Sequence, residues 1–268
     1  MVKSHALARS LIACAVLAMF VAPGRGVTAP RTSGTRCWID HGALVAPAAF
    51  GDIAGDFLID LAAPSSVLDE TRARMSGREG AAALGDLKFA GRRLKGLGVT
   101  IAPLDSRTGA FATAIAGALG ADVFSGFVVE IQAVPCRIRL LNRVGRPVGG
   151  AERIATRLDA GRPLVAARVT DGVRVRSGLF ALDTATWPTT LFGDRLARDP
   201  PPGTASPSPP VRLRALSLGG RLFEQVPATV APAKPVGGAR GSIGLSVLSR
   251  GRLRLDMRHG WAQLDLPQ

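Results

Sequence analysis

The sequence predicts a mostly β fold with short helices, built from two tandem copies of one small domain. Beyond residue 37 the apolar runs are short and end at Gly or Pro, which is typical of strands joined by tight turns. Four sequence blocks then recur in the same order about 123 residues apart, which indicates an internal duplication. Brief helices are expected only at 68–75 and 191–198.

The N-terminal segment has the pattern of an export signal. Lys3 and Arg9 form a basic start, Leu11–Ala22 is an uncharged apolar run of 12 residues, and small residues follow. The run is shorter than the roughly 20 residues that span a bilayer. We therefore expect a signal peptide at 1–29, cleaved near residues 22–30, and a periplasmic or secreted protein. An uncleaved anchor, or a lipid attached at Cys14, is the alternative.

The net charge of the chain is +14, and removal of the signal peptide lowers it to +11, because three basic and no acidic residues are lost. Basic side chains are scattered singly, without interleaved aromatic residues or a nucleic-acid-binding motif. We therefore expect no nucleic-acid partner and at most weak association with an anionic envelope surface.

Two cysteines, Cys37 and Cys136, remain after the signal peptide is removed. In an exported protein such a pair favours one disulfide, and two buried free thiols are the alternative. The remaining histidines, His41 and His259, lie far apart in sequence and are expected in exposed turns. With no Cys-x-x-Cys motif and no His cluster, we expect no metal and no cofactor.

The repeat defines the expected domain organisation. The first copy spans 35–143, a linker covers 144–159, and the second copy spans 160–268. The Pro-rich run 199–210 falls inside the second copy and is expected to be an exposed loop, because Pro lacks the donor that a sheet requires. The aligned blocks are 55–68 with 178–191, 87–91 with 216–220, 99–103 with 228–232, and 117–124 with 241–248.

In each copy an apolar strand ends in an Asp, followed by a turn rich in small residues, Ser and Thr. The sequences are Ile59-Asp60-Leu61-Ala62 and Leu182-Asp183-Thr184-Ala185, and a Gly-x-x-Gly turn follows each about 60 residues later. This pattern resembles the retropepsin-like aspartic protease unit. Two units in one chain resemble the bilobal pepsin arrangement and the tandem bacterial retropepsin-like proteins. The resemblance implies two β-barrel lobes related by pseudo-twofold symmetry, and a monomer.

The resemblance also implies an aspartic peptidase, with Asp60 and Asp183 as the catalytic pair and a peptide or protein as substrate. Two adjacent carboxyl groups do not both ionise easily, so one keeps a proton while the other activates a water. Ala62, Thr184 and Ala185 are the supporting turn residues, with the Thr184 hydroxyl bonding across the lobe interface. Leu61 lacks that hydroxyl, so Leu61 is expected to need an apolar pocket and Thr184 another partner.

Alternatives to catalysis follow from the same residues. Asp60 and Asp183 would be ordinary strand-end residues that cap their own turns. A catalytically inactive bilobal protein would bind extended peptides in the interlobe cleft by strand addition. Asp122 and Asp256 are interpreted as surface or turn acids. In the family fold the terminal strands of a unit lie close together, which implies a disulfide between Cys37 and Cys136 within the first copy.

Overall fold

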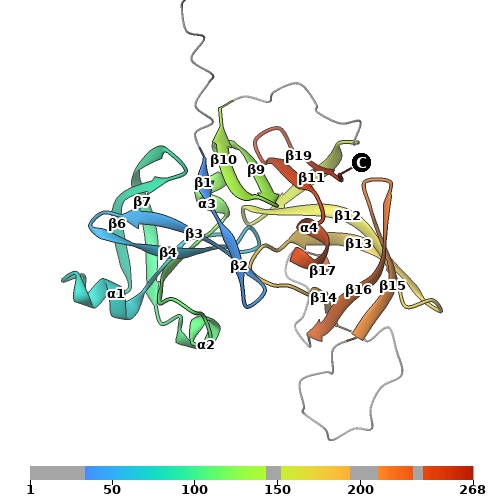
Figure 1. The fold of residues 1–268 in the computed structure, drawn as a ribbon, viewed down its shortest axis with the longest axis horizontal. Coiled ribbons are helices and arrows are strands. Elements are labelled where there is room, and N and C mark those ends of the chain that lie inside the picture. The colour runs from blue at the N-terminus through green and yellow to red at the C-terminus, as the bar shows by residue number, and fades with distance from the viewer. Residues whose placement is uncertain (1–33, 143–151, 194–210, 232–237, 268) are drawn as a thin grey trace, which may run out of the picture. The chain divides into compact units, whose positions relative to one another are not determined.

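The structure is a computed structural model that describes residues 34–142, 152–193, 211–231 and 238–267. The signal peptide, the Pro-rich run and residues 144–151 of the expected linker lie outside the described residues. Strands dominate the described chain, with four short helices among them (Figure 1). The predicted mostly β, two-barrel fold class is confirmed.

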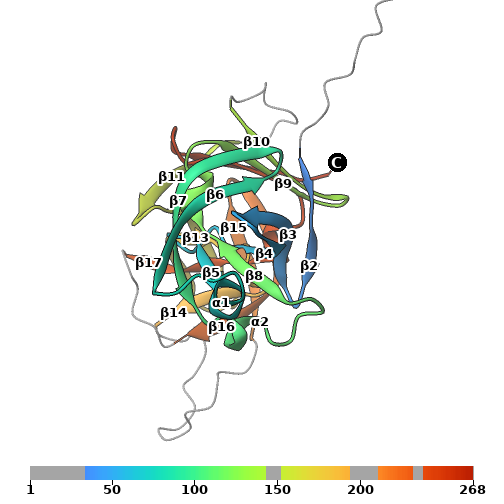
Figure 2. The ribbon, with the colours of Figure 1, turned by 90° about the vertical axis from the view of Figure 1, so that its left-hand side faces the viewer.

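The first barrel is a closed ring of six strands in the order β3-β4-β8-β5-β7-β6, and pairing of β3 with β6 closes it. Helix α1 packs against β5 and β7 and lies in front of the barrel in Figure 2. The elements are β3 (Ala43–Phe50), β4 (Ile53–Ile59), β5 (Val67–Asp69), α1 (Glu70–Met75), β6 (Ala82–Phe89), β7 (Arg92–Ala102), α2 (Asp105–Thr108) and β8 (Ile115–Leu119).

The second barrel repeats this ring in the order β12-β13-β17-β14-β16-β15, and pairing of β12 with β15 closes it. Each strand corresponds to the strand at the same place in the first ring. The elements are β12 (Arg162–Thr170), β13 (Val175–Leu182), β14 (Thr189–Phe192), β15 (Val211–Leu218), β16 (Arg221–Ala231) and β17 (Ala239–Ile243).

The duplication extends to irregularities of register. The parallel pairing of β4 with β8 shifts beside Phe57, and that of β13 with β17 shifts beside Phe180. These two phenylalanines are 123 residues apart and both belong to one hydrophobic core that includes side chains of both barrels. The repeat found in the sequence is therefore a repeat of strand order, register and packing.

A six-stranded sheet, three strands from each copy, joins the two halves in the order β1-β10-β9-β18-β19-β11. The first copy contributes β1 (Thr35–Arg36), β9 (Val128–Ala133) and β10 (Cys136–Leu141), and the second β11 (Ile154–Asp159), β18 (Arg252–Asp256) and β19 (Trp261–Asp265). Strand β2 (Trp38–Asp40) pairs with β3, and α3 (Ala121–Phe124) and α4 (Leu245–Leu248) follow β8 and β17.

At the centre of this sheet Glu130 of β9 lies opposite Arg254 of β18. The two residues are 124 apart in sequence and hold equivalent positions of the two copies. The Arg254 Nε donates to Glu130 at 2.9 Å, and Arg139 Nη1 donates to it at 2.6 Å. Burial raises the pKa of Glu130, but the hydrogen bonds from Arg254 and Arg139 outweigh it and leave the pKa below its ordinary 4.5.

Ile154–Asp159, at the end of the expected linker, forms β11, which pairs with β19 at one end and with β12 at the other. One expectation about local structure is corrected. Leu191, expected to begin a helix, lies in β14, where it pairs with β16 and β17. Helix α1 begins at Glu70, capped by the Asp69 carboxylate, which accepts from the Arg72 N–H.

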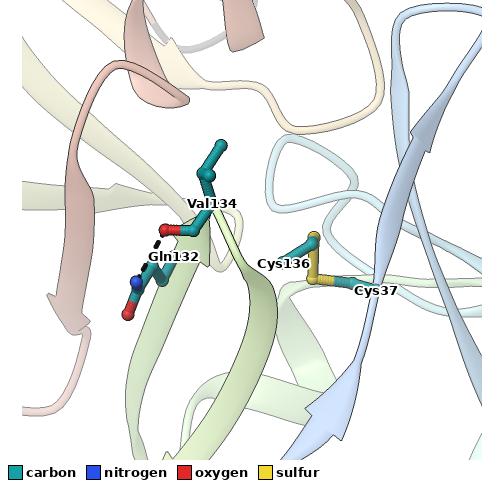
Figure 3. The surroundings of a disulfide bond; sticks show 4 residues. All are labelled: Cys37, Gln132, Val134 and Cys136. Atoms are coloured by element: carbon teal, nitrogen blue, oxygen red, sulfur yellow. Dashed lines mark hydrogen bonds between the residues drawn. A yellow bond between two sulfur atoms is a disulfide. The ribbon is translucent and has the colours of Figure 1, made fainter.

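A disulfide joins Cys37, between β1 and β2, to Cys136 at the start of β10 (Figure 3). The two residues are 99 apart in sequence, and their Cα atoms are 5.0 Å apart. The Cys37 N–H also donates to the Cys136 carbonyl at 3.3 Å. The cross-link therefore joins the two ends of the first copy. No described helix has the length and apolar character needed to cross a membrane.

Candidate active site

Asp60 and Asp183 are the residues that directly follow β4 and β13, at equivalent ends of the two barrels. The Asp60 N–H donates to the Leu119 carbonyl at 2.9 Å, and the Asp183 N–H donates to the Ile243 carbonyl at 3.0 Å. Each bond continues a parallel strand pairing by one residue. The same local structure thus presents a carboxylate from each copy.

Each carboxylate first caps its own turn. Asp60 Oδ1 accepts from the N–H groups of Ala62 and Ala63 at 3.1 and 3.0 Å. Asp183 Oδ1 accepts from the Ala185 N–H at 3.0 Å. These bonds alone are what an ordinary Asp turn makes. A contact between the Asp turns of the two copies distinguishes this site from two ordinary Asp turns.

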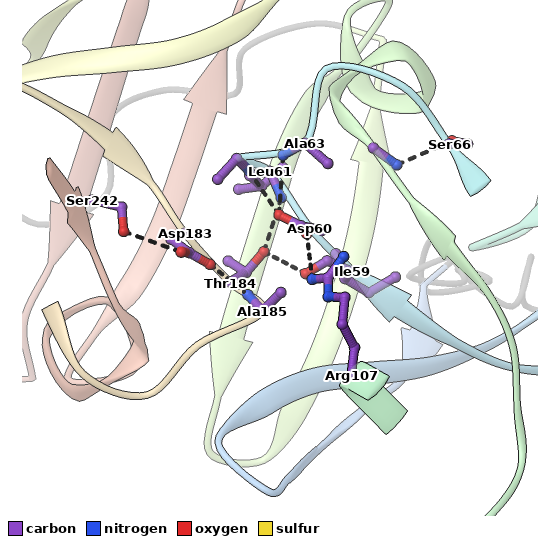
Figure 4. Close-up of polar contacts among 12 residues, drawn as sticks. Ile59, Asp60, Leu61, Ala63, Ser66, Arg107, Asp183, Thr184, Ala185 and Ser242 are labelled. Carbon is purple, nitrogen blue, oxygen red and sulfur yellow. Dashed lines mark hydrogen bonds and ion pairs between the residues drawn. The ribbon is translucent and has the colours of Figure 1, made fainter. Parts of the chain in front are cut away.

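The Thr184 side chain makes that contact and is fully buried (Figure 4). Its hydroxyl donates to the Ile59 carbonyl at 2.5 Å and accepts from the Leu61 N–H at 3.1 Å. We expected this hydroxyl to need another partner because Leu61 has no hydroxyl; its partners are backbone groups, which any residue at 61 provides. Leu61 itself is fully buried in the main hydrophobic core.

The Oδ2 atoms of the two carboxylates have different partners. Asp183 Oδ2 accepts from the Ser242 hydroxyl at 3.1 Å. Asp60 Oδ2 accepts from Arg107 Nη2 of α2 at 2.8 Å (Figure 4). One member of the pair is thus bound by a neutral hydroxyl and the other by a cation.

Burial and proximity set the electrostatics of the pair. Asp60 is 5% exposed and Asp183 is 9% exposed. Burial raises the pKa of Asp183, and the negative charge of Asp60 raises it further, against the opposing hydrogen bonds of Ala185, Thr186 and Ser242. A carboxyl group that favours its protonated form beside an ion-paired carboxylate is an arrangement suited to general acid–base chemistry.

The first glycines of the two Gly-x-x-Gly sequences, Gly117 and Gly241, were expected in tight turns but lie within β8 and β17. A Cβ atom built on Gly117 would lie 2.6 Å from the Val67 carbonyl of β5, and one on Gly241 would lie 2.0 Å from the Thr190 carbonyl of β14. These glycines therefore permit close contact between neighbouring strands.

The other two acids singled out in the sequence also have structural contacts. Asp122 accepts from both the N–H and the hydroxyl of Ser66, at 2.9 and 2.8 Å. Asp256 is a turn acid, as expected, but is 1% exposed and accepts from the N–H and ring nitrogen of His259. Neither residue belongs to the pair formed by Asp60 and Asp183.

Two site residues were not predicted. Ser242 lies in the aligned block 241–248, and its counterpart in the first copy, Ala118, has no polar group. Arg107 lies between aligned blocks, 47 residues from Asp60 in sequence, where the repeat offers no comparison. Their roles depend on tertiary contacts alone.

No protein-family model matches the chain, and no curated protein matches its sequence. Among solved structures, the aspartic proteinase from Irpex lacteus matches with a TM-score of 0.54 at 11% sequence identity, and the match covers 88% of this chain and 97% of that chain. The fold is that of a pepsin-like aspartic proteinase. The expected aspartic proteinase fold is thereby confirmed, and at 11% identity the likeness concerns the fold alone.

Proposed function

We propose that this chain is an aspartic endopeptidase that hydrolyses peptide bonds with Asp60 and Asp183. The observation that carries the proposal is the Thr184 hydroxyl, which ties the turn of one carboxylate to the backbone on both sides of the other. Such hydrogen bonds fix the position of one Asp turn relative to the other, which a catalytic pair of carboxylates requires. The elevated pKa of Asp183 beside the charge of Asp60 supports the same conclusion.

In the first step the oxygen of a water attacks the peptide carbonyl carbon while Asp60 takes a proton from that water. Asp183 gives its proton to the carbonyl oxygen. A tetrahedral diol forms, Asp60 is left protonated and Asp183 ionised. Collapse of the diol breaks the C–N bond as Asp60 gives its proton to the leaving nitrogen and Asp183 takes the proton of one diol hydroxyl, whose oxygen becomes the carbonyl oxygen of the product acid. Both carboxyl groups thus return to their starting protonation states without a covalent intermediate.

The test is cleavage of a peptide library between pH 3 and pH 7 by the wild type and by the Asp60→Asn and Asp183→Asn variants. Each variant is expected to lose at least about 100-fold in rate, as removal of a general acid or base does. Asp86→Asn is a matched control, because Asp86 pairs with Arg93 on an exposed hairpin. This variant should cleave the peptides at the wild-type rate. Wild-type cleavage by both site variants would exclude the proposal.

A second function, binding of extended peptides without hydrolysis, is favoured by one observation. Arg107 bonds the Oδ2 of Asp60, so this oxygen is occupied by a cation instead of standing free for a water. Titration of the same peptide library by fluorescence anisotropy separates the two functions. Saturable binding with no new termini after long incubation supports the binding protein, and multiple turnover supports the enzyme.

We further propose that the protein is exported and works in the periplasm or outside the cell. The basic and apolar pattern of residues 1–29 supports this, as does the Cys37–Cys136 disulfide, since such bonds persist in oxidising compartments. N-terminal sequencing of the protein from fractionated cells tests it. A mature end between residues 22 and 30 in the periplasm or medium is expected, and an intact Met1 in the cytoplasm contradicts it.

A further inference from the structure

The hydrogen-bond partners of the two carboxylates differ in a way that the duplication makes visible. Asp183 Oδ2 accepts from the Ser242 hydroxyl. The equivalent position in the first copy is Ala118, which carries no hydroxyl. The first copy therefore lacks the neutral donor of the second.

Arg107 takes the place of that donor. Its Nη2 lies 2.8 Å from Asp60 Oδ2, and its side chain, 44% exposed, reaches the buried carboxylate from α2. The two kinds of donor differ chemically, because a hydroxyl can either donate or accept a hydrogen bond whereas a guanidinium only donates. Oδ2 of Asp60 therefore accepts the guanidinium N–H, whereas the Ser242 hydroxyl can reorient to accept a hydrogen bond from a protonated Asp183.

We propose that Arg107 is a positioning residue that holds Asp60 in an ion pair and so leaves the proton of the pair on Asp183. The inference rests on the proposed function only for its consequence in catalysis, since the position of the proton is a property of the resting protein. It gives the two equivalent aspartates fixed and different tasks: Asp60 accepts the proton of the water and Asp183 donates to the carbonyl oxygen.

The charged groups near the pair are few among the described residues. Helix α2 brings Asp105 together with Arg107. Strand β3 packs on the Asp183 turn through the bond from the Leu44 N–H to the Thr184 carbonyl at 2.8 Å. Asp40, the last residue of β2, and His41, in the turn that leads to β3, pair with one another at 2.7 Å. Arg107 is thus the cation in direct contact with the pair.

The test is a pH titration of the full chain with 13C-labelled aspartate, followed by carboxyl NMR, in which the Asp60→Asn and Asp183→Asn variants assign the two signals. In the wild type we expect the shift of a protonated carboxyl at Asp183 alone. In Arg107→Met we expect it to be divided between the two carboxyls. Arg107→Lys, which keeps a donating cation, should restore the wild-type pattern.

Two further variants guard against a merely structural effect. Arg74→Met removes another exposed arginine that pairs with a carboxylate, Glu70, and should leave both signals unchanged. Adding Ala118→Ser to Arg107→Met supplies the hydroxyl found at Ser242 and should keep the proton divided, as neutral donors do not select one carboxyl. A proton that stays on Asp183 in Arg107→Met overturns the inference. Because the titration requires no substrate turnover, it tests the position of the proton even if the protein does not cleave peptides.

If the protein cleaves peptides, the pH profile provides a second measurement. The rate of Arg107→Met should fall and the acid side of its profile should move, while its KM changes less than threefold. A rise in KM with an unchanged pH profile would instead make Arg107 a substrate-binding residue and contradict the inference.

Discussion

Replacing Thr184 by Val tests whether one hydroxyl ties the two Asp turns together. Val keeps the shape and β-branching of Thr and replaces the hydroxyl by a methyl group. Two buried backbone groups, the Ile59 carbonyl and the Leu61 N–H, then lose their partner. At about 1 to 3 kcal/mol for each unsatisfied group, the free energy of unfolding should fall by about 2 to 6 kcal/mol. With a urea m-value of about 3 kcal/mol per molar, the midpoint falls by about 0.7 to 2 M.

The matched control is Thr189→Val in the same lobe. Thr189 is also fully buried, but its hydroxyl has no hydrogen-bond partner among the described residues. Replacing an unsatisfied buried hydroxyl by a methyl group should leave the free energy of unfolding unchanged or raise it by up to about 2 kcal/mol. The reasoning is refuted if the two variants unfold within about 0.5 kcal/mol of one another.

Three other changes address separate features. Replacing Cys37 and Cys136 together by Ala opens a cross-link across 99 residues and should lower the free energy of unfolding by about 2 to 5 kcal/mol in urea; no change contradicts a disulfide in solution. Because the pKa of Asp183 is raised in the folded protein, its stabilising contribution is present at low pH and lost as pH rises. Asp183→Asn should therefore raise the melting temperature more at pH 7 than at pH 3. Equal increases at the two pH values would contradict this prediction. Gly241→Ala, whose Cβ would lie 2.0 Å from a carbonyl oxygen, should lower the free energy of unfolding in urea by about 1 to 3 kcal/mol or more. Gly98→Ala, whose Cβ would have no neighbour within 4 Å, should leave it unchanged. Similar losses in the two variants would argue against a close strand contact at Gly241.

The fold was predictable because the duplication provided an internal comparison. Gly117 and Gly241 mark the same strand contact, and Phe57 and Phe180 the same register shift, so the pattern of one copy supports that of the other. Boundaries were less predictable. β11 begins at Ile154 inside the expected linker, because its two halves pair with strands that lie far away in sequence.

The site was predictable only where the two copies align. Asp60 and Asp183 came from the repeat, but the interaction of Arg107 with Asp60 joins an unaligned segment to an aligned one. The effect of Leu61 was misjudged for another reason: the sequence shows side chains, whereas Thr184 bonds to the backbone at 59 and 61. The presence of Leu61 in place of a hydroxyl-bearing residue thus removes one hydroxyl from the interface, but it leaves the backbone donor and acceptor of the Thr184 hydroxyl intact.

The pairing of Glu130 with Arg254 favours the association of two different lobes. Because the two residues are equivalent, two identical first lobes associated by the same symmetry would place glutamate against glutamate, and two second lobes arginine against arginine. Each such arrangement lacks the coupling of a close charge pair, about 1.5 kcal/mol or more. This position therefore favours contact of each lobe with its covalent neighbour over contact with a copy of itself.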